Sequence, residues 1–345
     1  MSKKTHYTEV INILQELHAD FPTYNLGRHL ATALADYGDI WGITDKELAF
    51  ALSKYKSEIE MDVPHTDDSE LEKIIKEGHY VFALDIRISS LQAIEENIDA
   101  AEKMRYGYAA LDVTDEKAFA DVLDSAQQKF GRIDCLINNA GVMTTPFMKT
   151  DDGFEFQNGV NHLGHFALVA QLFDLLKSTK DSRLVIVSSI AHKRGEINLD
   201  NYMFENEKEY TPMKSYSQSK LSNLLFMYEL NRRMKDKNVN VKVMAAHPGV
   251  SRTELTRYML NPIVAKLMLP LFWIFTQSAK RGAQPQIRAA VDSNVNSGEY
   301  YGPSGFNEMK GRAVLVKAEP KAHHEKHAKE LWDLSEKLTS VKFDI

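Results

Sequence analysis

Tyr216 and Lys220 are the residues of this sequence whose types and spacing best suit acid–base chemistry. Residues four apart lie on one face of a helix, and the stretch from Tyr216 to Lys235 has a helical pattern. A phenol has a pKa of about 10, but a nearby ammonium favours the phenolate and lowers that pKa. The pair therefore predicts proton transfer to or from an alcohol oxygen. Tyr210 and Lys214 share the spacing, but Pro212 disfavours a regular helix between them.

Two further polar residues extend this candidate site. Ser189 follows a short apolar run, where its hydroxyl could bind a reacting oxygen or only stabilise a turn. Asn161 is a polar residue inside an apolar helical stretch, where it could also only bend or pack the helix. Together with Tyr216 and Lys220, these residues predict a cluster that binds an oxygen atom and moves a proton.

The elements that must position these residues alternate between apolar runs and helical stretches from residue 79 onward. Continuous apolar strands separated by helices indicate a parallel sheet covered on both faces, and ligands bind at the carboxyl ends of such strands. The expected strands are Val81–Leu84, Ala109–Leu111, Ile133–Ile137, Leu184–Val187 and Val241–Ala246, and the expected helices are Ser89–Lys103, Glu116–Phe130, Phe154–Lys177 and Tyr216–Lys235. Polar residues or glycine follow each strand, which predicts a binding site at this edge.

A family resemblance rests on the motifs at these strand ends and on the helices. The motifs are Asn138-Asn139-Ala140-Gly141, Asn161, Ser189, Tyr216-Ser217-Gln218-Ser219-Lys220 and Pro248-Gly249. As a set they resemble the short-chain dehydrogenase/reductase family over about residues 79–345. The stretches 150–166, 218–226 and 300–303 resemble its retinol-dehydrogenase-like branch. The implied fold is a Rossmann-like doubly wound parallel α/β sheet.

The resemblance also implies a reaction and a role for each motif. The family transfers a hydride between a nicotinamide and a carbonyl or alcohol, with the protein supplying orientation and proton handling. Tyr216 would be the general acid/base, Lys220 would lower its pKa and hold the nicotinamide ribose, and Ser189 would polarise the substrate oxygen. Asn161 would anchor a water that relays protons to Lys220. The implied cofactor-binding residues are Tyr216, Lys220, Asn139, Ala140, Gly141, Asp112 at the adenine, Pro248, Gly249, and Thr253 at the carboxamide.

Asp85 bears on the choice of cofactor. A carboxylate at the end of the second strand of this fold accepts hydrogen bonds from the ribose 2′-hydroxyl and repels a 2′-phosphate. This favours NAD, although Arg87 could soften the preference and leave NADP possible. The alternative is that Asp85 only caps the following turn.

One expected motif is missing from this sequence, namely the glycine-rich turn Thr-Gly-x-x-x-Gly-x-Gly after the first strand. Its glycines let the backbone approach the pyrophosphate at a helix N-terminus. Leu26–Leu30 superficially resembles the end of such a turn, but it lacks the other glycines and a preceding strand. Glu58–Val63 could instead form a strand that replaces the first one, followed by a turn at Pro64–Asp68. Asp67 and Asp68 in that turn would repel phosphate. We therefore expect a first strand that is missing or replaced, and a catalytically impaired binding or interaction protein is the alternative function.

Residues 1–78 form the second expected part of the chain. They are poor in glycine and acidic, whereas the rest is nearly balanced in charge. Helical patterns cover residues 8–17, 26–36 and 45–54, and Thr44 with Glu47 predicts a capping box for the last of these. We expect a helical N-terminal segment of unknown role.

Composition limits the partners, the metal sites and the cellular compartment that we expect for this protein. The 345 residues carry a net charge of −6 without a basic cluster, which argues against a nucleic-acid partner. The single cysteine, Cys135, excludes an intramolecular disulfide and a cysteine metal cage. Met1–Asn12 lacks a signal-peptide pattern, and the apolar stretch Leu260–Phe275 is interrupted by prolines and a lysine. We expect a cytoplasmic protein without a metal.

The segment after Pro248-Gly249 indicates the class of substrate, and analogy with the family indicates the oligomeric state. Tyr258–Phe275 is rich in Leu, Met, Ile and Phe, which favours a small hydrophobic substrate such as a retinoid, a steroid or a lipid-like aldehyde. Shallow contact with a membrane surface and simple core packing are the alternatives. The resemblance implies a homo-oligomer, usually a dimer formed through the helices near residues 154–177 and 216–235.

Overall fold

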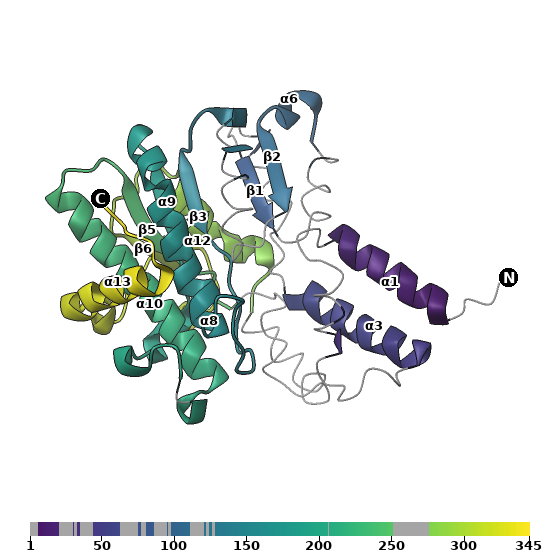
Figure 1. Ribbon diagram of the computed structural model, residues 1–345. Helices are drawn as coiled ribbons and strands as arrows, with labels where there is room; N and C mark the ends of the chain where they lie inside the picture. The colour runs from purple at the N-terminus through teal and green to yellow at the C-terminus, as the bar shows by residue number, and fades with distance from the viewer. Residues whose placement is uncertain are drawn as a thin grey trace. The chain divides into compact units, whose positions relative to one another are not determined.

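The computed structural model describes residues 6–20, 44–62, 81–85, 98–110, 128–205, 207–250 and 276–345, with a few single residues between them (Figure 1). The chain divides into two compact units, Met1–Lys129 and Phe130–Ile345. This division falls later than the expected boundary after residue 78, which stays a prediction. None of the described helices is long and apolar enough to cross a membrane.

The first unit begins with two helices, α1 (His6–Asp20) and α3 (Asp45–Asp62), which pack together. Their shared core contains Val10, Ile13, Leu17, Ala49, Leu52 and Tyr55. The capping box is present, since the Glu47 carboxylate accepts from the Thr44 N–H at 2.9 Å and the Thr44 hydroxyl accepts from the Glu47 N–H at 3.3 Å. Because α3 continues to Asp62, the expected replacement strand Glu58–Val63 is wrong: these residues extend a helix that begins at a strong cap. The turn Pro64–Asp68 and most of Leu26–Asp36 lie outside the described residues.

The same unit holds a two-stranded parallel sheet. Strand β1 (Val81–Asp85) pairs with β2 (Tyr106–Ala110), with Val81 opposite Tyr106 and Asp85 opposite Ala110. Helix α6 (Ala100–Lys103) precedes β2 and is capped by Asp99, whose side chain accepts from the N–H groups of Ala101 and Glu102. Most of the other two helices expected here, Ser89–Lys103 and Glu116–Phe130, lies outside the described residues.

The second unit is built on a five-stranded sheet. Its strands, in spatial order, are β3 (Cys135–Asn138), β4 (Arg183–Val187), β5 (Lys242–Ala246), β6 (Tyr300–Pro303) and β7 (Ala313–Leu315). The first four are parallel, and β7 runs antiparallel to β6. Within the described residues, β3 pairs with β4 alone. The Rossmann-like α/β fold class is confirmed.

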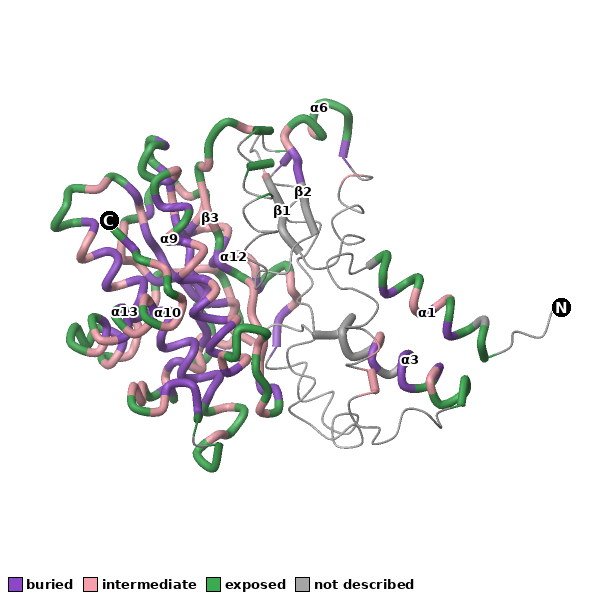
Figure 2. The backbone as a smooth tube through the Cα atoms, viewed as in Figure 1, coloured by how far each residue is buried: buried purple, intermediate pink, exposed green. Residues whose placement is uncertain are grey.

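Helices cover both faces of this sheet, as Figure 1 shows. Helices α9 (Gly164–Ser178), α10 (Pro212–Asp236) and α13 (Glu325–Thr339) lie on one face, and α12 (Ala279–Val291) lies on the other. Leu184 and Ile186 of β4 join the core beneath the first group, whereas Val185 packs in the cluster that contains Ala289 of α12. Most residues of α10 are buried (Figure 2), so its side chains are held in place along nearly its whole length.

Short helical turns complete the second unit, and several of them carry the site described below. They are α8 (Phe156–Asn158), the π-helical turn η1 (Gly159–Leu163), and the 3₁₀ turns η2 (Ile190–Arg194), η3 (Leu199–Asn201), η4 (Glu207–Glu209), η6 (Phe306–Glu308) and η7 (Pro320–His323).

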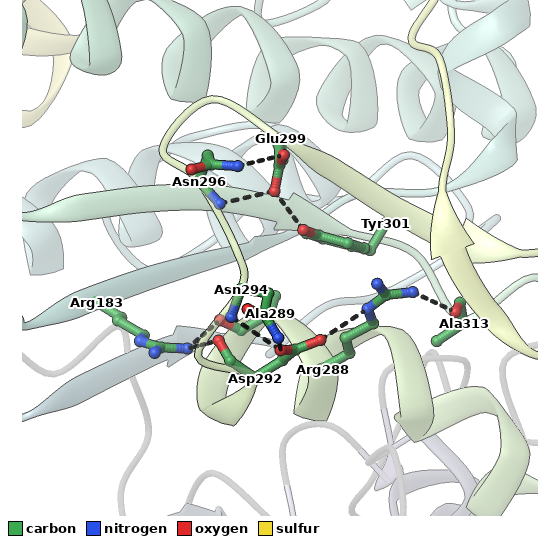
Figure 3. Close-up of polar contacts among 9 residues, drawn as sticks. All are labelled: Arg183, Arg288, Ala289, Asp292, Asn294, Asn296, Glu299, Tyr301 and Ala313. Carbon is green, nitrogen blue, oxygen red and sulfur yellow. Dashed lines mark hydrogen bonds and ion pairs between the residues drawn. The ribbon is translucent and has the colours of Figure 1, made fainter.

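A polar network fastens α12 to the amino end of the sheet (Figure 3). The Arg183 guanidinium, at the start of β4, donates to the carbonyls of Ala289 at 3.3 Å and Asp292 at 2.9 Å, where α12 ends. A cation near the C-terminus of a helix satisfies carbonyls that have no helical partner. Arg288 donates to the Asp292 carboxylate at 3.2 Å and to the Ala313 carbonyl at 2.7 Å. These contacts tie the helix to the start of β4 through Arg183 and to β7 through Arg288.

Candidate active site

Helix α10 places Tyr216 and Lys220 one turn apart in the interior. The helix begins at Pro212, a residue that suits the first helical position because it needs no N–H partner there, and the Thr211 hydroxyl caps it by accepting from the Lys214 N–H at 3.2 Å. Tyr210 therefore lies outside the helix. Tyr216 and Lys220 are both buried, and the ammonium lies 5.8 Å from the centroid of the Tyr216 ring.

Ser189 stands where β4 gives way to η2. Its Oγ accepts from the Ala191 N–H at 3.2 Å and so caps this turn, and its hydroxyl lies close enough to the Tyr216 phenol to lower the pKa of that phenol. The neighbouring Ser188 hydroxyl donates to the Lys220 carbonyl at 2.7 Å. The end of the strand is thus joined to α10, and the two hydroxyl groups of the candidate site lie together.

Asn161 lies in a π-helical turn. The expected continuous helix Phe154–Lys177 is divided into α8, η1 and α9, and such single π turns are frequent at functional sites. The Asn161 amide accepts from the Val142 N–H at 2.7 Å and donates to the Val142 carbonyl and the Ser219 hydroxyl, both at 2.9 Å. Asn161 therefore holds the loop after Gly141 against α10. The water relay through Asn161 stays a prediction.

The space beside Lys220 suits the nicotinamide ribose. Among the described residues, the Lys220 ammonium has one hydrogen-bond acceptor, the Val187 carbonyl at 3.3 Å, although it is only 4% exposed and carries three N–H groups. A Cβ on Gly141 would lie 3.0 Å from Asn161 Oδ1 and 3.3 Å from Lys220 Nζ. A glycine therefore leaves open the position beside the two unpaired N–H groups, where ribose hydroxyls could bind.

Burial sets the protonation states of this pair. It lowers the pKa of Lys220 to about 8 and raises the pKa of Tyr216, against the smaller lowering effect of the Ser189 hydroxyl. Desolvation of the phenolate therefore opposes the expected lowering of the Tyr216 pKa by Lys220, which stays a prediction. At neutral pH the phenol keeps its proton and can donate it.

The structure describes some of the remaining expected cofactor-binding residues and not others. Asn139 is exposed after β3, and the backbone of Ala140 faces the buried imidazole of His165. Pro248 and Gly249 follow β5, with the Pro248 carbonyl accepting from the Gln277 amide at 2.8 Å. Asp85 ends β1 in the first unit. The Asp85 side chain, Asp112, Thr253 and the apolar segment Tyr258–Phe275 lie outside the described residues.

Comparisons with known proteins agree with this geometry. The family model described as short chain dehydrogenase matches residues 71–203. Human retinol dehydrogenase 14 is 44% identical over 217 residues, which are 62% of this chain and 61% of that protein. Human retinol dehydrogenase 13 is 38% identical over 237 residues, which are 67% of this chain and 68% of that protein. The chain belongs to the short-chain dehydrogenase family. Its relatives place it in the retinol-dehydrogenase-like branch.

Solved structures of the family show the same fold. An uncharacterized protein from Mycobacterium Paratuberculosis is 32% identical, with a TM-score of 0.65 over 81% of this chain and 91% of that chain. A 3-ketoacyl-(acyl-carrier-protein) reductase from Brucella melitensis, complexed with NADH, is 16% identical, with a TM-score of 0.52 over 69% of this chain and 91% of that one. The chain spans 61% of the length of retinol dehydrogenase 14 from human and from mouse.

Glu155 is a site residue that the sequence did not reveal. Its carboxylate is fully buried and accepts from the backbone N–H groups of Gln157 and Asn158, from the Asn158 side-chain amide and from the Ser215 hydroxyl, at 2.7–3.0 Å. It thereby caps α8, just before the turn that holds Asn161, and fixes the residue that precedes Tyr216. The signal that could have indicated it is the run of polar residues, Glu155, Gln157 and Asn158, within a stretch expected to be buried.

We expect Glu155→Gln to destabilise this protein by about 3 kcal/mol, because the new amide N–H₂ would face hydrogen-bond donors in a fully buried position. The measurement is urea unfolding followed by circular dichroism. Glu207→Gln, an exposed substitution in η4, is the matched control and should leave the midpoint unchanged. Equal midpoints for the two variants would contradict the structural role of Glu155.

Proposed function

We propose that this protein is a nicotinamide-dependent oxidoreductase that interconverts a hydrophobic carbonyl compound and its alcohol. The observation that carries the proposal is the buried group formed by Ser189, Tyr216 and Lys220 beside Gly141. It combines a proton donor, a second hydroxyl and a partly unsatisfied ammonium at the carboxyl edge of a parallel sheet. That is the position at which ligands bind in this fold.

Residues of this chain would bind and orient the nicotinamide cofactor. Lys220 would hold the ribose hydroxyls with its two free N–H groups, and the backbone of Asn139, Ala140 and Gly141 would line the crevice. When bound, the nicotinamide cofactor supplies or accepts the hydride. The side-chain amide of Asn161 fixes the loop after Gly141 beside Lys220 through its hydrogen bonds to Val142 and Ser219.

The protein moves the proton. In the direction of reduction, the Tyr216 phenol donates its proton to the oxygen of the carbonyl substrate while the Ser189 hydroxyl hydrogen-bonds the same oxygen. Because burial raises the pKa of Tyr216, the phenol remains a donor at neutral pH. Burial lowers the pKa of Lys220 to about 8, so that its charge is readily lost above that pH.

Substrate class and cofactor follow from the relatives and from the sequence. The curated relatives are named retinol dehydrogenases, and a solved neighbour is a 7α-hydroxysteroid dehydrogenase in complex with NADH. These names and the apolar segment Tyr258–Phe275 support a retinoid, steroid or lipid-like substrate. Asp85 at the end of β1 supports NAD, with NADP as the alternative. We further propose a cytoplasmic homo-oligomer, with peripheral membrane contact as the alternative setting.

We expect NADH to bind saturably, and more tightly than NADPH, when the purified protein is titrated and nicotinamide fluorescence is followed. Binding is the decisive measurement because the glycine-rich phosphate turn is missing from the sequence. No binding of either cofactor at millimolar concentration would support the alternative, a binding or interaction protein that keeps the dehydrogenase fold. Tighter binding of NADPH would overturn the role given to Asp85.

A further inference from the structure

A chain of polar contacts crosses the carboxyl edge of the sheet without using Tyr216 or Lys220. Lys193 Nζ lies 2.8 Å from Glu308 Oε1, and His247 Nε2 lies 3.0 Å from Glu308 Oε2. The Gly249 N–H then donates to His247 Nδ1 at 3.1 Å. Glu308 thus links η2, which follows Ser189, with the turn that contains Pro248 and Gly249.

The chemistry of each contact fixes the protons along this chain. A backbone N–H can only donate, so His247 Nδ1 must be the acceptor, and the proton of a neutral imidazole then lies on Nε2 and is donated to Glu308. Burial lowers the pKa of His247, which favours this neutral form. Burial opposes ionisation of Glu308, but hydrogen bonds from His247 and Lys193 outweigh it and lower its pKa to about 2. Glu308 is therefore a carboxylate with both oxygens engaged.

The backbone around Glu308 is held in a costly conformation. Asn307 and Glu308 have φ angles of +49° and +58°, in the left-handed region that is sterically disfavoured for residues other than glycine. The Val250 N–H donates to the Met309 carbonyl at 2.7 Å, so the strained segment is pressed against the turn after Gly249. Strain of this kind persists only where the surroundings impose it, and it is concentrated at functional sites.

The space around His247 is equally restricted. A Cβ on Gly302 would overlap the His247 ring, and a Cβ on Gly249 would overlap the Met309 carbonyl. His247 therefore packs directly against the backbone of Gly302, and its two nitrogens face Gly249 and Glu308. Movement of Glu308 would be transmitted to the Gly249 turn through this ring.

We propose that Glu308 is a positioning residue that keeps the Ser189 turn and the Pro248–Gly249 turn at a fixed separation, by pairing with Lys193 on one side and with His247 on the other. The geometric part stands on the contacts alone. Its consequence for catalysis rests on the proposed function, in which the first turn faces the substrate and the second faces the nicotinamide.

The test of the geometric part is hydrogen–deuterium exchange of the full-length protein, followed by mass spectrometry. Lys193→Met removes one end of the chain at a side chain that is 33% exposed, so the fold should survive. We expect amide exchange in residues 247–250 to accelerate roughly three- to tenfold, within the range for directly coupled neighbours. The control is Lys177→Met, whose lysine is 32% exposed and pairs with Asp174 on α9, and which should leave these residues unchanged.

Two outcomes decide the proposal. Unchanged exchange in residues 247–250 of Lys193→Met, or an equal change in Lys177→Met, would overturn it whether or not the protein is an enzyme.

In the kinetic arm, Glu308→Gln should raise the KM for the hydrophobic carbonyl substrate about tenfold with a smaller change in kcat, whereas a merely structural residue would lower the active fraction and leave KM unchanged. A wild-type protein that binds no cofactor would contradict the proposed function, and the exchange result would still decide the role of Glu308.

Discussion

Replacing Tyr216 by phenylalanine is expected to lower kcat for carbonyl reduction about 10²- to 10⁴-fold, the usual contribution of a positioned general acid. The substitution removes the hydroxyl that lies with Ser189 and leaves a ring of the same shape in a buried position. The fold should therefore be unchanged, and NADH should still bind saturably. The measurements are steady-state oxidation of NADH in the presence of a hydrophobic aldehyde and a fluorescence titration of the same variant.

The matched control is Tyr210→Phe, because Tyr210 and Lys214 have the same spacing as the proposed pair. Tyr210 lies before α10, where its hydroxyl donates to the Thr145 carbonyl at 2.7 Å, and Lys214 lies over the Phe204 ring. We expect this variant to keep turnover within about threefold of wild type. Normal turnover by Tyr216→Phe would remove the assignment of proton transfer to this residue, and similar losses in both variants would indicate a general effect of removing a tyrosine hydroxyl.

Much of the site could be predicted because its residues are coupled to local patterns. Ser189 comes soon after the apolar run Leu184–Val187, and Tyr216 and Lys220 share a helix face at fixed spacing, so their positions follow from the periods of strand and helix. Pro212 also predicted that Tyr210 and Lys214 do not share a regular helix, and Tyr210 lies before the helix that begins at Pro212. Five of the seven strands that the structure describes were expected for the same reason.

The rest depends on contacts between distant parts of the chain. Glu308 meets His247 across 61 positions and Lys193 across 115, and no period in the sequence relates them. The π-helical turn at Asn161 was hidden because a continuous helix fits the apolar pattern equally well. The pKa values depend on a further feature: the proximity of Lys220 to Tyr216 could be inferred from their spacing, but the degree of burial, which shifts both pKa values, could not.

The Lys220→Met variant should separate stability from catalysis. Burial lowers the pKa of Lys220 to about 8 in the folded protein, whereas an unfolded lysine titrates near 10.4. The unfolded state therefore binds more protons between these values, so this group makes stability rise with pH across that window and imposes its full cost below pH 8. Methionine carries no such cost, and the Val187 carbonyl still accepts from the Asn223 amide at 3.1 Å.

We therefore expect Lys220→Met to unfold at higher urea concentration at pH 7, with a gain of about 3 kcal/mol from the two pKa values, and to lose cofactor binding and turnover. Its stability should lack the rise between pH 8 and 10.5 that the wild type shows. Lys214→Met, exposed on the same helix, is the control and should keep that rise. A less stable Lys220→Met variant at pH 7 would mean that the ammonium is satisfied by partners in the folded protein, and the free N–H groups assigned to the ribose would then not exist.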